Sequence, residues 1–486
     1  MLKSDNMTEA LYARLPVFLQ NAACYWYGHK EAAVRLGPAF ERYLQEMQES
    51  EKWSRGQICA YQDEKVRNLV SYAYHNVPFY HEQMRERRLL PQDIRGTSDL
   101  AKLPILTKED VRANADRLLS TNARRHRLLP RHTSGTTGKC LELYVDPSAV
   151  AMQWAMWWRH RMRFGLRLGT RHVNFTGKPV VPQAQSAPPY WRWNLPMHQA
   201  LINMQHLTPA KIAPIVEFLD REAFEFYSGY PSIIHALVSA AKHAGLKLHC
   251  PPRVITTGAE NILANQRADI EEFTGAILTD QWGMTEACAN ASQCRKMVYH
   301  EDFEFGVIER QEARRVDGVI EGSLLCTGFA TPDFPLIRYE PGDIGIWAAG
   351  VARCECGLES PSLLGIMGRM DDYVITPEGS RIMRFDYVFK HTVNVRECQV
   401  VQDQIGEIRL RIVRRPPYSN ADERLLEAEI RKWISRTLRV RFEYVTEIER
   451  ESNGKFRAVK SLLSIDRPAG RSSDVSCDGA SNQRVC

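Results

Sequence analysis

The stretch of this chain that is most informative about its function is Thr133-Ser134-Gly135-Thr136-Thr137-Gly138-Lys139. It offers hydroxyl groups, flexible backbone N–H groups and one cation together. Its glycines can adopt positive φ angles, which turn successive amides inward as a cradle for an anion, and Lys139 can neutralise charge. The stretch predicts a phosphate-binding loop. An ordinary Gly/Thr/Ser loop between two strands is the alternative that composition leaves open.

This loop is not of the Walker type. The pattern G-x-x-x-x-G-K-[ST] requires Ser or Thr after the lysine, because that hydroxyl binds Mg²⁺, and the chain has Cys140 there. A magnesium ligand must therefore come from another part of the sequence.

Length and composition exclude several classes of protein. The chain has 486 residues, which exceeds the size at which one hydrophobic core stops growing, so two or more domains are expected. Its net charge of +6 is small and its arginines are scattered, which argues against a nucleic-acid-binding protein. We find no apolar stretch of about 20 residues and no secretory signal pattern. A cytoplasmic protein is expected, in which the 12 cysteines are buried, reactive or metal-bound rather than paired.

The sequence divides into four predicted parts. Residues 1–75 carry amphipathic helix-forming sequence with aromatic anchors such as Tyr25-Trp26-Tyr27, and they predict a helical subdomain. Residues 76–370 predict a large domain and residues 371–466 a small mobile one. Residues 467–486 are rich in Ser, Gly, Asp and Asn and predict a disordered tail.

Strand-like and helical stretches alternate in the large domain. Apolar runs of strand type occupy residues 224–227, 253–257 and 275–279. Such alternation predicts parallel strands joined by crossover helices. The predicted fold class is therefore α/β, with mixed or parallel sheets and helices in the large domain, followed by a small α+β domain.

Two local patterns predict individual elements. Thr107 precedes a helical stretch with Asp110 at capping-box spacing, which predicts a helix start. In the small domain the pattern predicts two strands, a helix and a final strand, at residues 397–401, 408–413, 422–438 and 442–448.

A second chemical motif follows the strand-like run at residues 275–279. Trp282 offers a stacking face for a purine, and Gly283 lets the backbone approach a ligand closely. Thr285 can donate to a phosphate oxygen, and Glu286 can bind Mg²⁺, which prefers oxygen ligands. By itself the segment could also be a strand-end turn with a buried tryptophan.

Three further segments carry charge at turns. Asp343 lies in a Pro-Gly-Asp turn and could accept hydrogen bonds from ribose hydroxyls. The segment 368–374 contains Arg369 and Asp371 and has the character of a linker. Lys455 follows an Asn-Gly turn in the small domain.

These five segments, in this order, resemble the adenylate-forming superfamily of acyl-CoA synthetases, adenylation domains and luciferases. The runs Tyr230-Pro231-Ser232, Thr257-Gly258-Ala259-Glu260 and Pro335-Leu336-Ile337-Arg338-Tyr339 are most similar to the phenylacetate-CoA ligase and capsule-biosynthesis-associated branch. The resemblance covers roughly residues 60–465.

The resemblance implies where ATP binds. Residues Thr133 to Lys139 would hold its phosphates, Asp343 its ribose, and Arg369 would also contact the nucleotide. The residues that it places around adenine are Gly258, Ala259, Glu260 and Trp282.

It also implies which residues carry the chemistry. Thr285 and Glu286 would serve phosphate and Mg²⁺, and Lys455 would bridge the carboxylate and the α-phosphate. Attack of a carboxylate on the α-phosphorus crowds negative charge into one place, where a lysine and Mg²⁺ are stabilising. Asp371 resembles the hinge about which such enzymes rotate their small domain.

The implied activity is ATP-dependent activation of a carboxylic acid as acyl-AMP with release of pyrophosphate, followed by transfer to a thiol, most commonly that of CoA. Transfer to an amine or to a carrier protein, or ATP binding without turnover, are the alternatives. The expected partners are a small carboxylate, ATP and the acceptor, with no nucleic acid and no membrane span. A monomer or a homodimer is expected.

The chain departs from the family pattern at two positions. The family usually has proline where this chain has Cys140, and tyrosine where it has Trp282. Neither change removes chemistry, since tryptophan also stacks and proline mainly stiffens the loop. Lys455, Glu286 and Asp343, whose loss would indicate an inactive relative, are all present.

A cysteine and histidine cluster indicates a second metal. Cys354 and Cys356 form a close pair, and Cys294 and His300 lie upstream. Three thiolates and one imidazole would complete a structural Zn²⁺ site, and the resembled branch often has a comparable cluster. Reduced thiols without metal are the alternative, and Cys288 competes for membership.

The acyl pocket is expected beside the nucleotide, and its predicted lining is Tyr227, Ser228, Gly229 and Tyr230. The aromatic run Trp154, Trp157 and Trp158 either adds to this lining or forms one buried helix face. An aromatic-walled pocket would favour an aryl or medium acyl carboxylate.

Overall fold

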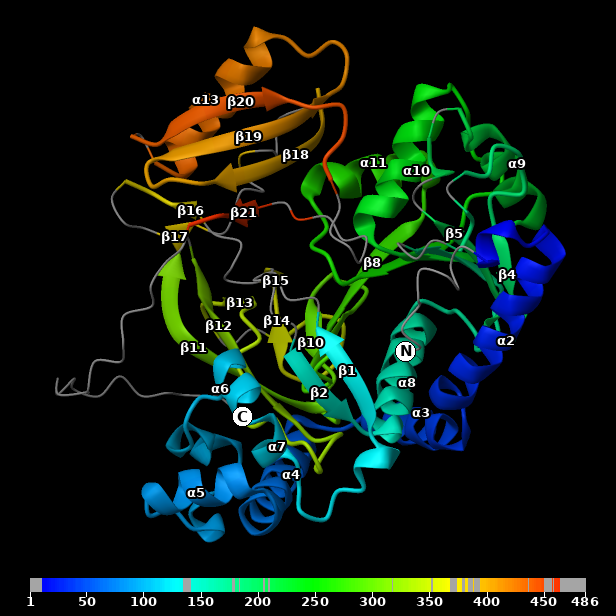
Figure 1. The fold of residues 1–486 in the computed structure, drawn as a ribbon. Coiled ribbons are helices and arrows are strands. Elements are labelled where there is room, and N and C mark those ends of the chain that lie inside the picture. The colour runs from blue at the N-terminus through cyan, green and yellow to red at the C-terminus, as the bar shows by residue number, and fades with distance from the viewer. Residues whose placement is uncertain are drawn as a thin grey trace. The chain divides into compact units, whose positions relative to one another are not determined.

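The computed structural model describes residues 11–133, 141–176, 180–182, 184–203, 206–208, 210–316, 318–350, 353–367, 374–377, 381–382, 388, 394–435, 437–449, 457 and 459–463. Among these residues the chain forms two compact units, one that ends at residue 367 and one that begins at residue 374. Figure 1 shows the elements of each unit. Within the described part of the chain, no helix combines the length and the apolar composition that crossing a bilayer requires.

Helices dominate the first part of the large unit: α2 (Val17–Arg35), α3 (Pro38–Ser50), α4 (Arg55–Asn76) and α5 (Pro78–Glu86). Ser54 begins α4 with a capping box to Gln57, and proline begins α3 and α5, where its missing N–H costs nothing. The helix start predicted at Thr107 is confirmed, because α6 (Lys108–Ala113) begins there and Thr107 Oγ1 accepts from the Asp110 backbone N–H at 3.1 Å.

A nine-stranded sheet forms the centre of this unit, in the order β14-β10-β9-β8-β7-β6-β3-β5-β4. Strands β5, β3, β6, β7 and β8 run parallel, and the flanking strands run antiparallel. The bounds are β3 (His172–Thr176), β4 (Arg192–Asn194), β5 (Gln199–Asn203), β6 (Phe226–Gly229), β7 (Val254–Gly258), β8 (Ile277–Gly283), β9 (Asn290–Gln293), β10 (Tyr299–Glu301) and β14 (Ser362–Leu363). The three strand-like runs of the sequence therefore form adjacent parallel strands, as predicted.

Helices cover both faces of this sheet (Figure 1). Consecutive residues of a strand belong to different hydrophobic clusters. Tyr227 and Ile255 belong to one cluster, with residues of α9 (Ile212–Glu222), α10 (Pro231–His243) and α11 (Ala264–Thr274). Phe226 and Val254 belong to the other, with residues of α3 and α8 (Pro147–Arg163). Because side chains alternate across a strand, both faces are apolar and both are buried.

A second, antiparallel sheet completes the unit. It contains β11 (Gly306–Val316), β12 (Val319–Gly328), β13 (Ile344–Ala348) and β15 (Gly365–Met367), and a separate hairpin pairs β1 (Leu129–Thr133) with β2 (Leu141–Val145). One hydrophobic cluster joins residues of α4, α5, β2, β11 and β12. The α4 helix therefore shares a core with the sheets, and the predicted subdomain boundary at residue 75 stays a prediction.

The second unit is a four-stranded sheet with a helix. Its strand order is β20-β19-β18-β21, with β18 (Val395–Gln402), β19 (Glu407–Arg414), β20 (Arg439–Tyr444), β21 (Val459–Ser461) and α13 (Asn420–Trp433). Two short strands, β16 (Val374–Ile375) and β17 (Arg381–Ile382), form a hairpin.

The predicted bounds of the helix and of the final strand in this unit are wrong, and that strand, β20, also ends at Tyr444 rather than at residue 448. Helix α13 ends at Trp433 rather than at residue 438, and β20 begins at Arg439, three residues before the predicted start. The predicted final strand is followed by β21. The predicted fold class is nevertheless confirmed: a large α/β domain and a separate small α+β domain.

Candidate active site

Three of the segments predicted to bind the nucleotide and the acyl group, those at the ends of β6, β7 and β8, meet at one edge of the large sheet. Strands β6, β7 and β8 are parallel neighbours, with Gly229 paired with Thr257 and Gly258 paired with Gln281. Their carboxyl ends therefore lie side by side. In open α/β sheets, ligands bind in the crevice outside this edge.

The backbone at this edge is shaped by residues without room for larger side chains. Gly229 has a φ of 156°, and a Cβ added there would lie 2.5 Å from the carbonyl oxygen of Phe175. Ala259, directly after β7, adopts a φ of 66°. Both strand ends consequently turn sharply at the edge, which exposes backbone groups to a ligand.

Trp282 and Asp343 lie in contact. The Trp282 Nε1–H donates to Asp343 Oδ2 at 3.1 Å, although the two residues are 61 positions apart. Trp282 is half-buried against the cluster that contains Tyr339 and Phe334. The structure thus brings together the residue predicted to stack on adenine and the residue predicted to hold ribose.

Glu286 is a buried carboxylate, and its side-chain contact is a tyrosine. Tyr339 is fully buried and its hydroxyl donates to Glu286 Oε1 at 3.1 Å. Among the described residues, no lysine or arginine forms an ion pair with Glu286. Carboxylate oxygens such as those of Glu286 are the ligands that hard cations prefer.

Tyr339 has no role that the sequence alone assigns. It belongs to the run 335–339, where its aromatic ring is consistent with a core residue. Only the contact with Glu286 identifies it as a positioning residue.

Asp280 fixes the end of β8. It accepts hydrogen bonds from the Thr257 hydroxyl at 2.6 Å and from the Tyr299 hydroxyl at 2.5 Å. Burial raises the pKa of Asp280 to about 6, although both hydroxyls favour its ionised form. Because Thr257 lies on the neighbouring strand β7 and Tyr299 on β10, which is separated from β8 by β9, these bonds tie the strand that carries Trp282 to the sheet on both sides.

The residues predicted to line the acyl pocket separate into two groups. Tyr227 lies in the hydrophobic core at 5.4 Å from the Phe175 ring, and burial raises the pKa of its hydroxyl. Ser228 is also buried. Tyr230 lies half-buried at the start of α10, close to Glu260, whose carboxylate accepts from the Ser232 backbone N–H at 3.2 Å. Tyr230 is therefore better placed at the crevice than Tyr227.

The three tryptophans of α8 have different surroundings. Trp158 is buried against Phe226, and Trp154 lies beneath the Arg35 guanidinium at 4.5 Å. Trp157 donates through Nε1 to Asn290 at 3.2 Å. Asn290 Oδ1 would lie only 2.5 Å from a Cβ added at Gly283, so Trp157 approaches the predicted site.

Several predicted residues cannot be placed. Thr133 is the last residue of β1. Nine other residues predicted for the nucleotide site, the hinge and the catalytic lysine lie outside the described part of the chain: Ser134, Gly135, Thr136, Thr137, Gly138, Lys139, Arg369, Asp371 and Lys455. Their predicted roles stay predictions.

The predicted metal ligands do converge. The ligand atoms of Cys294, His300, Cys354 and Cys356 all lie within 4.8 Å of one another. Cys294 Sγ and Cys354 Sγ are 3.7 Å apart, and Cys356 Sγ lies 3.3 Å from His300 Nε2. Two sulfurs on a tetrahedral Zn²⁺ would be separated by about 3.8 Å, given Zn–S bonds of about 2.3 Å.

Outer contacts orient these ligands. The other ring nitrogen of His300, Nδ1, lies 3.3 Å from the carbonyl oxygen of Ser360, which leaves Nε2 facing the cysteines. Backbone N–H groups of Lys296 and Leu358 donate to Cys294 Sγ and Cys356 Sγ at 3.3 and 3.4 Å. Cys288 instead contacts Met284 Sδ at 3.1 Å and is not part of the group.

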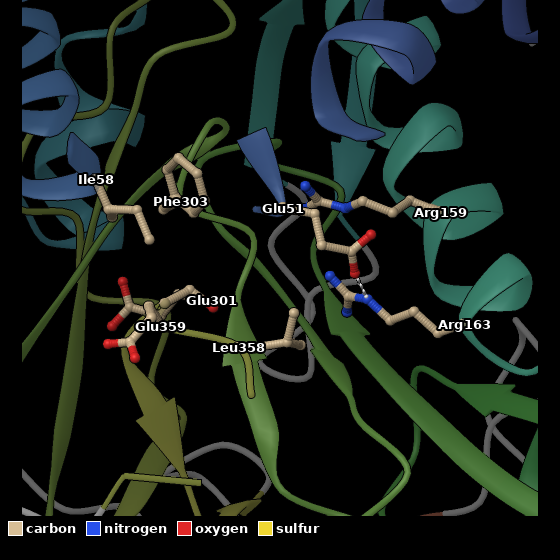
Figure 2. A pocket seen from close by; sticks show the side chains of 9 residues that line it. Glu51, Ile58, Arg159, Arg163, Glu301, Phe303, Leu358 and Glu359 are labelled. Atoms are coloured by element: carbon tan, nitrogen blue, oxygen red, sulfur yellow. Dashed lines mark hydrogen bonds and ion pairs between the residues drawn. The ribbon is translucent and has the colours of Figure 1, made fainter. Parts of the chain in front are cut away.

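A small cavity adjoins this cluster through Ser360 (Figure 2). Figure 2 shows Glu51 directed at Arg163, with Glu301 and Glu359 on the other side. The cavity is lined by Glu51, Ile58, Arg159, Arg163, Glu301, Phe303, Leu358, Glu359 and Ser360. None of these residues is predicted to bind the nucleotide or the acyl group, so we do not assign the active site to this cavity.

The sequence of this chain is similar to those of several known proteins. Residues 374–462 match the CapK C-terminal domain family. The chain is 24% identical to protein CapK of Staphylococcus aureus, over 93% of this chain and 98% of that protein. It is 24% identical to the phenylacetate-coenzyme A ligase of Thermus thermophilus, over 67% of this chain and 74% of that enzyme.

Solved structures share the fold. A 2-hydroxyisobutyryl-CoA ligase in the postadenylation state, in complex with 2-HIB-AMP, superposes with a TM-score of 0.65 at 18% identity, covering 85% of this chain and 91% of that one. Together with the sequence relatives, this similarity supports the predicted resemblance to the adenylate-forming superfamily, in the branch that contains CapK and the phenylacetate-CoA ligases.

Proposed function

We propose that this enzyme uses ATP to convert a carboxylic acid into an acyl-adenylate and then transfers the acyl group to the thiol of CoA. Support comes from the relatives named as phenylacetate-coenzyme A ligases in Thermus thermophilus and in Escherichia coli, the latter 23% identical over 66% of this chain. The fold of a CoA ligase that binds an acyl-AMP is consistent with the same chemistry.

The contact between Trp282 and Asp343 carries this proposal. It sets an aromatic face and a carboxylate side by side at the carboxyl edge of the parallel strands. An adenosine needs both, because its base stacks and its ribose hydroxyls donate to an ionised acceptor. Glu286 lies on the same segment, four residues after Trp282.

Glu286 would hold the Mg²⁺ that accompanies ATP. Its burial, its hydrogen bond from Tyr339 and its carboxylate oxygens suit a hard cation that prefers oxygen ligands. When bound, Mg²⁺ withdraws charge from the phosphates. The Tyr339 hydroxyl fixes the direction in which the Glu286 carboxylate presents its oxygens.

The remaining groups would act on the reacting atoms. A carboxylate oxygen of the substrate attacks the α-phosphorus, and the bond to pyrophosphate breaks. Lys455 would neutralise the attacking carboxylate, and residues 133–139 would hold the leaving pyrophosphate. The CoA sulfur then attacks the acyl carbon, and AMP leaves.

The acyl group would lie between Tyr230 and the Trp157 region. Tyr230 is half-buried at the start of α10, directly after β6, and Trp157 donates to Asn290, which lies beside Gly283. Aromatic walls of this kind favour an aryl or medium acyl chain over a small polar acid.

Exchange of labelled pyrophosphate into ATP tests the proposal. The full chain is incubated with ATP, Mg²⁺ and each member of a carboxylate panel that includes aryl and medium-chain acids. We expect exchange with an aryl or medium-chain acid. Tight ATP binding without exchange for any acid would refute the ligase activity. Omission of CoA, with hydroxylamine or an amine in its place, then identifies the acceptor from the product mass.

We further propose that Cys294, His300, Cys354 and Cys356 bind one structural Zn²⁺. All four positions of a tetrahedral ion would be occupied by protein, so the ion would take no part in the reaction. It would tie the segment 353–360 to β10 and to the turn after β9. Formation of this site would add to folding stability.

Metal analysis of the purified chain tests this site. We expect one zinc per chain in the wild type, loss of zinc in Cys356→Ser, and a lower unfolding temperature. Cys250→Ser is the matched control, because Cys250 is an exposed free cysteine outside the cluster. A wild-type protein without zinc after purification in zinc-containing buffer would contradict the assignment.

A further inference from the structure

The outward face of α2 is apolar. Phe18 and Trp26 lie two turns apart and each exposes 69% of its surface. Ala22 lies between them and is also exposed, and Tyr25 is 41% exposed. The predicted aromatic anchors Tyr25, Trp26 and Tyr27 are all exposed in the structure.

The inward face of α2 carries no large apolar side chain among its buried residues, which are Gln20, Cys24 and Gly28, and this departs from the usual pattern of a surface helix. Gln20 is buried and donates to the backbone oxygen of Leu15 at 2.8 Å, and its Oε1 accepts from Arg192 Nε at 2.7 Å. Gly28 packs so closely that an added Cβ would overlap the side chain of Asn194. The helix is therefore held by hydrogen bonds and close packing, and its aromatic side chains contribute little to the fold.

A further exposed apolar side chain lies on a turn that packs against α2. Helix α2 lies beside β4 at the outer edge of the first unit (Figure 1). The 3₁₀ turn η4 (Leu195–Met197) packs against α2, and its Leu195 is 58% exposed. We name the surface formed by Phe18, Ala22, Tyr25, Trp26 and Leu195 the aromatic patch. A group of exposed large apolar side chains on neighbouring elements is typical of an interaction site.

The cationic side chains of the segment that carries the aromatic patch are not offset by acidic ones within it. Residues 11–30 contain Arg14, His29 and Lys30 and no aspartate or glutamate. Lys30 lies one further turn along the stripe from Trp26 and is exposed. The next acid, Glu31, is paired with Arg35 at 2.8 Å. The segment therefore offers aromatic side chains flanked by cations.

We propose that the aromatic patch docks this enzyme on the surface of an anionic lipid bilayer. Tryptophan and tyrosine favour the boundary between headgroups and acyl chains, and lysine and arginine can keep their charges at the phosphates while their stems remain apolar. Helix α2 would lie in the plane of the interface, with Phe18 and Trp26 inserted below the headgroups.

A second copy of the chain fits this surface less well. In an antiparallel pairing centred on Ala22, Arg14 of one copy would face Lys30 of the other, and a parallel pairing would set Lys30 against Lys30. The segment contains no acid that could neutralise either contact. Like charges across an interface are repulsive, whereas anionic headgroups would pair with both cations.

Vesicle flotation tests the proposal with the full chain. The probe is vesicles of equal parts phosphatidylcholine and phosphatidylglycerol, compared with phosphatidylcholine alone. We expect flotation with the anionic vesicles, weakened by salt. The double variant Phe18→Ser/Trp26→Ser should bind at least about tenfold more weakly, since each aromatic loses its apolar burial.

Matched controls distinguish insertion of the aromatic patch from nonspecific binding of the protein to vesicles. Ile405→Ser/Leu462→Ser removes two exposed apolar residues of the other unit, which are 60% and 52% exposed, and should bind like the wild type. Lys30→Glu should weaken binding, whereas Lys247→Glu at another exposed lysine should not. Thermal unfolding and pyrophosphate exchange should be unchanged in all four variants, because these side chains lie at the surface.

Three outcomes would overturn the proposal. One is absence of wild-type flotation with anionic vesicles. Another is equal binding by wild type and Phe18→Ser/Trp26→Ser. The third is a wild-type dimer in light scattering that this double variant converts to a monomer while vesicles bind neither, which would assign the patch to self-association.

Discussion

Tyr339→Phe removes one hydroxyl from the environment of Glu286 and leaves the ring in place. The lost bond is 3.1 Å long and joins two buried groups, one of them a carboxylate. A hydrogen bond to a charged group contributes roughly 1.5–3 kcal/mol. If this bond holds Glu286 in the orientation that binds Mg²⁺, the variant should lose about 10- to 100-fold in adenylation at limiting Mg²⁺, since each 1.4 kcal/mol is about a factor of ten.

Pyrophosphate exchange as a function of Mg²⁺ concentration measures this loss. We expect half-saturation to move to higher Mg²⁺ in Tyr339→Phe and the rate to recover in part at high Mg²⁺. Tyr80→Phe is the matched control, because Tyr80 is another buried tyrosine of the same cluster, and its hydroxyl donates to Pro335 O at 2.9 Å. It should lower stability and leave the Mg²⁺ dependence unchanged.

The comparison with this control decides the interpretation. Wild-type Mg²⁺ dependence in Tyr339→Phe would refute the positioning role. An equal shift in both variants would show that damage to the shared core, and not the contact with Glu286, is the cause.

The other predictions concern the site edge, the acid limit of stability and the lysine of the small domain. Gly283→Ala should lower adenylation more than it lowers stability, because the new Cβ would lie 2.5 Å from Asn290 Oδ1; activity equal to wild type would show that the edge can relax. Burial lowers the pKa of both His160 and His172 to about 3, so the unfolded chain binds protons that the folded chain excludes, and stability should fall below pH 6.5 by roughly 1.4 kcal/mol per pH unit for each histidine. Urea unfolding between pH 4 and pH 7 checks this, and His172→Gln should reduce the slope; an unchanged slope contradicts the assignment. Lys455→Ala should reduce adenylation by orders of magnitude while ATP binding is retained, and comparable activity would contradict its role.

Much of the fold follows from local sequence. The strand-like runs at residues 224–227, 253–257 and 275–279 form β6, β7 and β8, because apolar residues on both faces require a sheet covered on both sides. The capping pattern at Thr107 predicts a helix start for an equally local reason, since the hydrogen bonds it makes are within one turn.

Other features depend on contacts that the sequence does not encode locally. The helical pattern of α2 is visible in the sequence, but which of its faces is buried is not. Its aromatic residues suggest a buried face, whereas the partners of Gln20 are Arg192 and the backbone near Leu15. An inward face made of Gln20, Cys24 and Gly28 can be recognised only when the opposite surface is known.

The residue types of the candidate site, and their order along the chain, are determined by the sequence alone. The sequence contains a tryptophan, a glutamate and an aspartate in segments that suit a nucleotide and Mg²⁺. It also contains three cysteines and a histidine, which are residue types that bind Zn²⁺. Tertiary structure decides that Trp282 meets Asp343, that Tyr339 meets Glu286, and that Cys294 and Cys354 lie 3.7 Å apart. These partners are separated by 53 to 61 positions, so no local periodicity relates them. Only the pairing of strands into sheets, driven by burial of their apolar faces, brings them within the range of a hydrogen bond or a shared ion.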